Sequence, residues 1–290
     1  MILANGTFHH VYDFDKFELP FGLHLSLPFG LTKFMVLQVV VVVLIYNIFR
    51  GLTDHIRGGG TATGWWYNFW EMQALYIRDN VVRPVIGDPH DSHDHGPGDH
   101  GHEAHGHGEQ AISVAHPADK YLPFIWSCYF YILFANLLGA VPFLGSATGN
   151  INVTLVLAGA AFVAVFLYGS QVHGPVGFFK AQVPKVEAPG PIKVFLVPMI
   201  FAIEIFGLFI KHGVLAIRLF ANIMGGHTVL GVMLGFIALA ANHGMWWVIA
   251  PSSVLGQIGV GMLELLVAFI QAYVFVFLTT IFISMSLHEH

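Results

Sequence analysis

The most unusual residue of the chain is Arg218, which lies in "VLAIRLFANIMGGH" (214–227), a stretch otherwise rich in Leu, Ile, Phe, Ala and Gly. An ionisable side chain at the centre of a bilayer costs at least about 2.5–3.5 kcal/mol, and such residues usually mark ion pathways. The guanidinium stays charged at every physiological pH, so it can attract a carboxylate and repel a hydronium ion but cannot pass a proton on. This chemistry is that of a barrier between two proton paths.

Polar residues form two stripes at heptad spacing. In a helix of about 3.6 residues per turn, positions seven apart return to nearly the same face. The first stripe holds Glu204, Lys211 and Arg218, extended by Asn222, and the second holds Gln257, Glu264 and Gln271. These residues either satisfy one another inside a bundle or line a path for ions, and intramembrane ionisable groups favour the path.

Three residues of this region are candidates for carrying protons. Glu and His exchange protons near neutral pH when their surroundings tune them, and Glu204, His227 and Glu264 have these side chains. No acid of the chain is an obvious mate for Arg218. We therefore expect its partner carboxylate to come from another subunit.

The composition is that of a multi-span membrane protein. Of 290 residues, 56% are hydrophobic and only 10% are charged, against roughly 25% charged residues in soluble domains. The single cysteine, Cys128, excludes an internal disulfide. The N-terminus has no recognisable signal peptide, so the first span is expected to act as its own insertion signal.

The pattern predicts an all-α polytopic fold with an extracytoplasmic N-terminal segment (1–30) and a first transmembrane helix (31–52). Arg50, Arg57, Arg78 and Arg83 follow that helix. The positive-inside bias places the N-terminus outside and the residues after the first span in the cytoplasm. The aromatic, amphipathic stretch 60–88 predicts an interfacial helix, with a soluble connector as the alternative.

A His-rich cytoplasmic loop (89–118) is expected to be disordered, because its composition offers no core. Its tract 90–110 holds seven histidines, and it either binds metal weakly or has no metal role. The remainder, 119–290, is predicted to be a channel region with a transmembrane hairpin (121–172).

Two apolar blocks, 194–241 and 245–287, end the chain and are much longer than one crossing needs. Some 45 helical residues would reach roughly 65–70 Å, about twice the hydrocarbon thickness. Each block is therefore either two short spans with a hidden turn or one strongly tilted helix. The C-terminus is expected in the cytoplasm.

"AIRLFANIMGGH" and "LLVAFIQAYVFVFLTTIFISMSLHEH", together with "IRDNVVRP" and "LFANLLGAVP", resemble subunit a of the F-type ATP synthases. The resemblance implies a non-catalytic, proton-translocating stator subunit of the inner membrane, which faces the c-ring with two tilted helices and assembles with the peripheral-stalk b subunits. It implies no cofactor.

The resemblance also implies roles for individual residues. Arg218 would receive the ring carboxylate and separate two half-channels, with Asn222 part of the same motif and Gln271 facing it. Glu204 would lie in the cytoplasmic half-channel, and His227 and Glu264 in the outer one, in the reverse order from many bacterial members. Lys211 and Gln257 would be secondary polar lining. Val214 and the His-rich insertion depart from the family pattern.

A divalent-metal transporter with a His-rich regulatory loop is the alternative interpretation. Such a transporter needs clustered His, Asp, Glu or Cys ligands near the midplane. The spans offer only scattered His212, His227, His243 and Glu264. His227 and Glu264 could share one structural ion if the fold brings them together.

Overall fold

The computed structural model describes residues 16–19, 23–26, 33–57, 64–87, 116–141, 146–181, 190–241 and 244–287. Within these ranges, five helices are long and apolar enough to cross a membrane. This confirms the predicted polytopic helical fold. One small addition precedes the first helix: strands β1 (Lys16–Leu19) and β2 (Leu23–Ser26) pair antiparallel, with Lys16 opposite Ser26.

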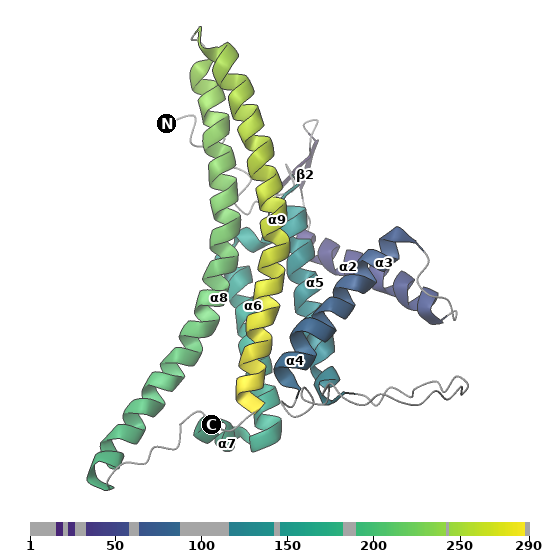
Figure 1. Ribbon diagram of the computed structural model, residues 1–290. Helices are drawn as coiled ribbons and strands as arrows, with labels where there is room; N and C mark the ends of the chain where they lie inside the picture. The colour runs from purple at the N-terminus through teal and green to yellow at the C-terminus, as the bar shows by residue number, and fades with distance from the viewer. Residues whose placement is uncertain are drawn as a thin grey trace, which may run out of the picture.

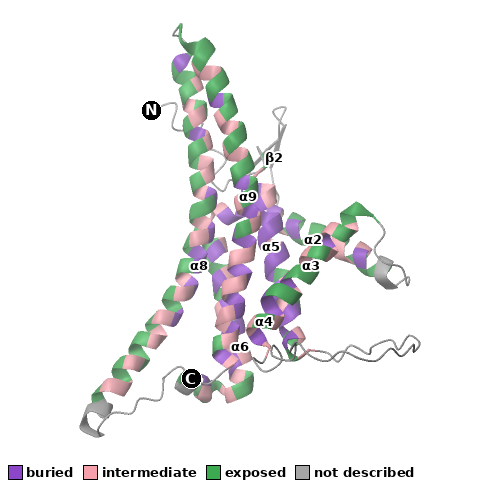
Figure 2. Cartoon of the chain, in the orientation of Figure 1, coloured by how far each residue is buried: buried purple, intermediate pink, exposed green. Residues whose placement is uncertain are grey.

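The first spanning helix, α2 (Lys33–Arg57), contains a run of five valines, 39–43. Valine favours strands in water, but inside a bilayer the backbone must satisfy its hydrogen bonds within one segment, and the run is therefore helical. About half of α2 is exposed, and Val39 and Val42 have exposed fractions of 63% and 55%. Figure 2 shows exposed residues over much of this helix. Its apolar surface is left to lipid or to another subunit.

The centre of the bundle is α5 (Leu122–Gly139), which packs against α2 and against the last helix of the chain. It is apolar all round, as expected for a helix with neighbours on every side, and Figure 2 shows it largely buried. A short 3₁₀ turn, η5 (Ala147–Gly149), leads into α6 (Ile151–His173). Asn150 begins α6 by accepting a hydrogen bond from the backbone N–H of Asn152 at 3.0 Å.

A second helical layer crosses the outside of α5 (Figure 1). It consists of α3 (Trp65–Ile77), a π-helical turn η2 (Arg78–Val82) and α4 (Arg83–Ile86). Trp126 of α5 donates a hydrogen bond to the Ala74 carbonyl at 3.0 Å, and Tyr129 donates one to Gln73 at 2.8 Å. These bonds hold an amphipathic, aromatic helix against the bundle.

Ion pairs fix the other end of this layer to the turn η4 (Pro117–Tyr121). Arg83 donates two hydrogen bonds to the Asp119 carboxylate, at 3.1 and 3.0 Å. Beside it, the hydrogen bond from Arg78 lowers the pKa of the Asp79 carboxyl, and the bond to Asp119 raises the pKa of Arg83. These two groups therefore stay ionised around neutral pH.

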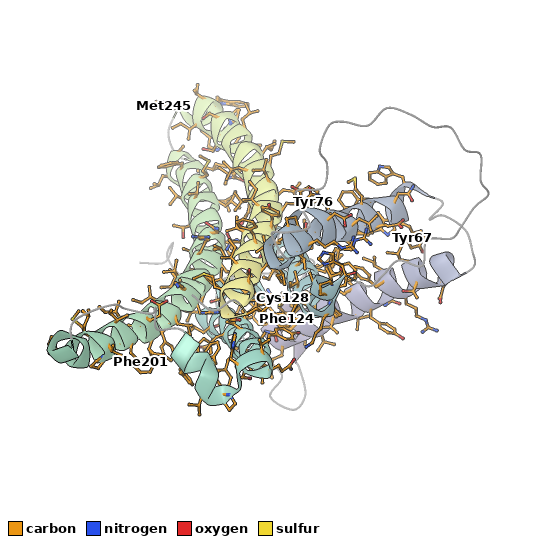
Figure 3. All side chains as sticks on the ribbon, turned by 60° about the horizontal axis from the view of Figure 1, so that its bottom comes forward. Tyr67, Tyr76, Phe124, Cys128, Phe201 and Met245 are labelled. Carbon is orange, nitrogen blue, oxygen red and sulfur yellow. The ribbon has the colours of Figure 1, made fainter. Side chains whose placement is uncertain are left out.

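The last two apolar blocks are two uninterrupted helices, α8 (Gly190–Ala240, 51 residues) and α9 (Trp246–Leu287, 42 residues). At about 1.5 Å per residue they reach roughly 75 and 63 Å, so the hidden-turn alternative is wrong. Figure 1 shows them side by side, with the N-terminal part of α8 swinging away from the bundle beyond the short helix α7 (Pro175–Ala181). In Figure 3, Met245 lies at the far end of this pair and Phe201 on the projecting part of α8.

Breaking the Arg83–Asp119 pair should measurably weaken the attachment of the 65–86 layer to the rest of the bundle. Arg83→Gln should increase hydrogen exchange of the amides in 65–86, because it removes the ion pair that holds this layer to η4. The increase should be modest, since both side chains are about one-third exposed and such pairs contribute about 1 kcal/mol or less. Arg50→Gln is the matched control, because Arg50 contacts only Tyr46 of its own helix among the described residues. Equal exchange in the two variants would contradict the role of the ion pair in docking this layer.

Candidate functional site

One hydrogen bond joins the two polar stripes. Asn222 Nδ2 on α8 donates to Gln271 Oε1 on α9 at 2.6 Å. Gln271 is buried, whereas the Asn222 side chain reaches the surface of α8. Periodicity predicts one of these residues on each polar stripe, and the structure brings the two into direct contact across α8 and α9.

A cavity of about 350 Å³ lies beside this bond, between α8, α9 and the end of α5. Four polar side chains line it: Asn136, Asn222, Glu264 and Gln271. The rest of the wall consists of small and aliphatic residues such as Ala221, Gly225 and Val267. A cavity of this size, with polar groups on part of its wall, has room for several water molecules.

Glu264 enters the cavity wall because Gly226 has no side chain. A Cβ built on Gly226 would lie 2.6 Å from Glu264 Oε1 and 3.0 Å from its carboxyl carbon. Glu264 is 8% exposed, and its Oε1 is buried without a hydrogen-bond partner. The absence of a side chain at Gly226 on α8 thus leaves room for the Glu264 carboxyl group of α9.

Two amide nitrogens beside the cavity are also buried without a hydrogen-bond partner among the described residues, like Glu264 Oε1. They are Asn136 Nδ2 and Gln271 Nε2. Buried polar groups in proteins are nearly always paired with protein or with water. Three such atoms from residues around one cavity therefore indicate a hydrated cavity.

Arg218 lies one turn before Asn222 on α8 and is half-buried. Within the described ranges the structure gives it neither a hydrogen bond nor an ion pair. Ile217, its neighbour, has an exposed fraction of 57%, and Val214 one of 47%. The arginine therefore borders a surface of α8 that the described part of this chain leaves open.

Glu204 and Lys211 form a separate pair, with 3.7 Å between Lys211 Nζ and Glu204 Oε1. Fourteen residues of α8 separate Glu204 from Arg218, roughly 21 Å at 1.5 Å per residue, and His227 lies roughly 14 Å beyond the arginine on the other side. The ionisable groups thus fall on both sides of Arg218 along one helix.

The other predicted residues lie apart from the cavity. His227 is half-buried and is not among its lining residues, and Gln257 Nε2 is buried without a partner one heptad before Glu264. His212 is buried between Phe162 and Phe282, with Nδ1 2.9 Å from the Leu208 carbonyl oxygen. His243 and the tract 90–110 lie outside the described residues.

Metal coordination finds no support in the part of the chain that the structure describes. No three His, Cys, Asp or Glu side chains come together there in an arrangement that could hold an ion. The divalent-metal transporter interpretation is therefore unsupported.

The sequence argument missed the contribution of α5 and its following turn. Asn136 is 1% exposed, and its Oδ1 accepts a hydrogen bond from Thr148 Oγ1 at 3.0 Å, while Ser146 Oγ lies 2.9 Å from the same threonine oxygen. The signal is present in the sequence: Asn136 is an amide in an apolar span, and two hydroxyl residues, Ser146 and Thr148, lie in the turn of the predicted hairpin (121–172). The hydroxyl groups of Ser146 and Thr148 in this turn are buried and hold the Asn136 amide in place.

Comparison with known proteins agrees with this geometry. Residues 106–284 match the family model described as ATP synthase A chain. The chain is 32% identical over 281 residues to ATP synthase subunit a of Myxococcus xanthus, covering 94% of this chain and 79% of that one. It is 32% identical over 292 residues to ATP synthase subunit a of Chloroherpeton thalassium, covering 97% and 76%. The chain therefore belongs to the ATP synthase subunit a family, the membrane-embedded, proton-translocating stator subunits of ATP synthase.

Proposed function

We propose that this chain supplies two proton half-channels to the c-ring of an F-type ATP synthase and that Arg218 separates them. The observation that carries the proposal is the cavity beside Asn222 and Gln271, where three buried polar atoms lack a protein partner. Water in the cavity satisfies these atoms and gives protons a path to and from the Glu264 carboxyl.

Arg218 acts as the barrier between the two paths. Its guanidinium cannot release a proton, and it borders an open face of α8 without a partner in the described part of this chain. A deprotonated carboxylate on the c-ring would pair with it as that site passes. The same charge would repel a hydronium ion that attempted to cross directly.

The second half-channel would run along the opposite part of α8. Glu204 exchanges protons with the cytoplasm there, and the Lys211 ammonium group, 3.7 Å away, attracts its carboxylate. In the outer half-channel Glu264 is the carrier, assisted by His227 and Gln257. Each proton that passes through 100 mV yields about 2.3 kcal/mol, which the catalytic subunits of the complex would use.

The orientation follows from charge. Arg50 at the end of α2, and Arg78 and Arg83 in the next layer, place that side in the cytoplasm by the positive-inside rule. The N-terminus would then be outside and the C-terminus inside, in a bacterial inner membrane. The exposed valine face of α2 is the surface that we assign to the peripheral-stalk b subunits or lipid.

The barrier role of Arg218 predicts the loss of coupled pumping in Arg218→Gln. ATP-driven acidification of vesicles that carry the whole complex should fall to background, because protons could cross between the half-channels without turning the rotor. Immunodetection of the complex should show normal assembly. The control is Lys211→Gln, which removes the cation one heptad earlier on α8 and should retain partial pumping. Normal acidification by Arg218→Gln would overturn the barrier.

The packing of Glu264 against Gly226 predicts that Gly226→Ala displaces the carboxyl group, since the new Cβ would lie 2.6 Å from Oε1. ATP-driven acidification should drop by about an order of magnitude, because a shift of about 1 Å can cost a reacting group up to about 100-fold. Gly235→Ala is the matched control on α8, with open space at its Cβ. Equal pumping by the two variants would count against Glu264 as the carrier.

A further inference from the structure

A second cavity, of about 560 Å³, lies between α2, α5 and α6 and shares no lining residue with the cavity beside Gln271. Its wall is mainly apolar and includes Phe124 and Cys128 of α5, which are labelled in Figure 3. Sites for small molecules usually measure roughly 300–1,000 Å³, so this volume is that of a ligand site. We call this cavity the α2–α5–α6 groove.

One end of the groove lies where α2 and α6 both begin. Phe34 and Leu37 of α2 pack on Ala147 of η5, the turn that leads into α6. Two polar residues line the groove near this turn, Gln38 and Asn152. Gln38 directly follows Leu37, and Asn152 is the second residue of α6. Both amide side chains therefore belong to the same end of the groove.

From this end the groove extends along α5 and α6 into the apolar part of the bundle. Leu138, near the end of α5, packs against the same cluster as Ala147. Phe124 lies fourteen residues before Leu138 and also lines the groove, so the groove extends over roughly 20 Å at 1.5 Å per residue. One leaflet of a bilayer has about 15 Å of hydrocarbon, half of about 30 Å. The groove thus has the length of a single acyl chain.

The polar groups of the groove suit a neutral hydrogen-bond acceptor. No charged side chain is among the described residues that line it. Gln38 and Asn152 offer amide NH₂ donors, and neither side chain bonds to another described residue. Ser127, further along, already donates its hydroxyl hydrogen to the Pro123 carbonyl at 2.6 Å. An ester carbonyl therefore fits the amide end, whereas a phosphate would stay outside, because a buried charge needs a partner.

The shape of the groove favours a flexible chain over a helix of another subunit. A helix about 10 Å across would need roughly 1,600 Å³ over 20 Å of length, about three times the volume of the groove. The rim is continuous with the surface that the spanning helices expose, since Met35 and Val156 both line the groove and are at least half exposed. The hydrocarbon chains of the bilayer therefore reach the opening.

We propose that the α2–α5–α6 groove binds one acyl chain of a membrane glycerolipid. The ester carbonyl of the lipid accepts hydrogen bonds from Gln38 and Asn152, and the chain lies over Cys128 toward Phe124. Because the surrounding medium is also hydrocarbon, the affinity comes from close packing and from these hydrogen bonds. The chain fills the space between α2 and α6, which are joined mainly through α5 and η5. This inference does not depend on the proposed proton path.

The test uses the whole complex in detergent, where no bilayer surrounds it, and a phosphatidylcholine probe with a photoreactive diazirine at the end of one acyl chain. After irradiation, peptide mass spectrometry should find the label in 124–131 of α5. Unlabelled diester phosphatidylcholine should compete about two- to tenfold better than its diether analogue, which has no carbonyl, because one net hydrogen bond is worth about that factor. Equal competition by the two lipids would overturn the inference. So would the absence of label in 124–131, the result expected if a helix of another subunit covers the groove.

A filled groove should lose the label. Ala160 lines the groove on α6, so Ala160→Phe places an aromatic ring where the chain lies, and labelling of 124–131 should fall to background. Leu155→Phe is the matched control, since Leu155 is an exposed residue of the same helix and is not among the lining residues. Equal labelling in the two variants would contradict the proposed site.

The amide end has its own pair of variants, which serves also if Ala160→Phe fails to assemble. Gln38→Leu removes one donor and should lower labelling of 124–131 about two- to tenfold. Asn47→Leu makes a comparable change on α2 away from the groove, where Asn47 donates to the Val43 carbonyl of its own helix at 2.8 Å, and should label as the wild type does. The same labelling in both variants would show that Gln38 does not hold the lipid.

Discussion

The structure depends on the cost of leaving a polar group without a partner in hydrocarbon. That cost makes the valine run of α2 helical, since only a helix satisfies the backbone within one segment. The same cost requires the few polar side chains of the core to find hydrogen-bond partners. Asn222 and Gln271 pair directly across α8 and α9, whereas Glu264 Oε1 and Asn136 Nδ2, beside the cavity, have no hydrogen-bond partner among the described residues. Polar groups without partners among the described residues are thus found at the cavity that we propose as part of the proton path.

Close approach of helices is the second condition for this site. Gly226 admits the Glu264 carboxyl and Gly139 admits Ser146. In both cases a single methyl group would collide with a polar atom of the site. Other helix-surface glycines, such as Gly213 and Gly235, have open space at their Cβ positions. Gly226 therefore shapes the cavity wall directly, and Gly139 acts through Ser146 on the hydroxyl groups that hold Asn136.

Much of the fold and part of the site could be predicted from the sequence. Hydropathy and length indicate the spans, and heptad spacing places Asn222 and Gln271 each on the polar stripe of its own helix, because helix periodicity is local. The continuity of α8 and α9 could not be decided from periodicity alone, since "GG" at 225–226 resembles a break. Asn136 was missed for another reason: its role depends on Thr148, which is twelve residues away across a turn. Contacts across turns and between helices are set by packing, which periodicity does not encode.

The length of α8 and α9 has a mechanical consequence. A stationary subunit beside a turning rotor bears a sideways load, and a hinge within either helix would absorb that load as bending. Where the two continuous helices of 51 and 42 residues pack on α5 and α6, such a load passes into the bundle instead. Lateral force on the open face of α8 is then carried to the rest of the subunit with little displacement of the cavity wall.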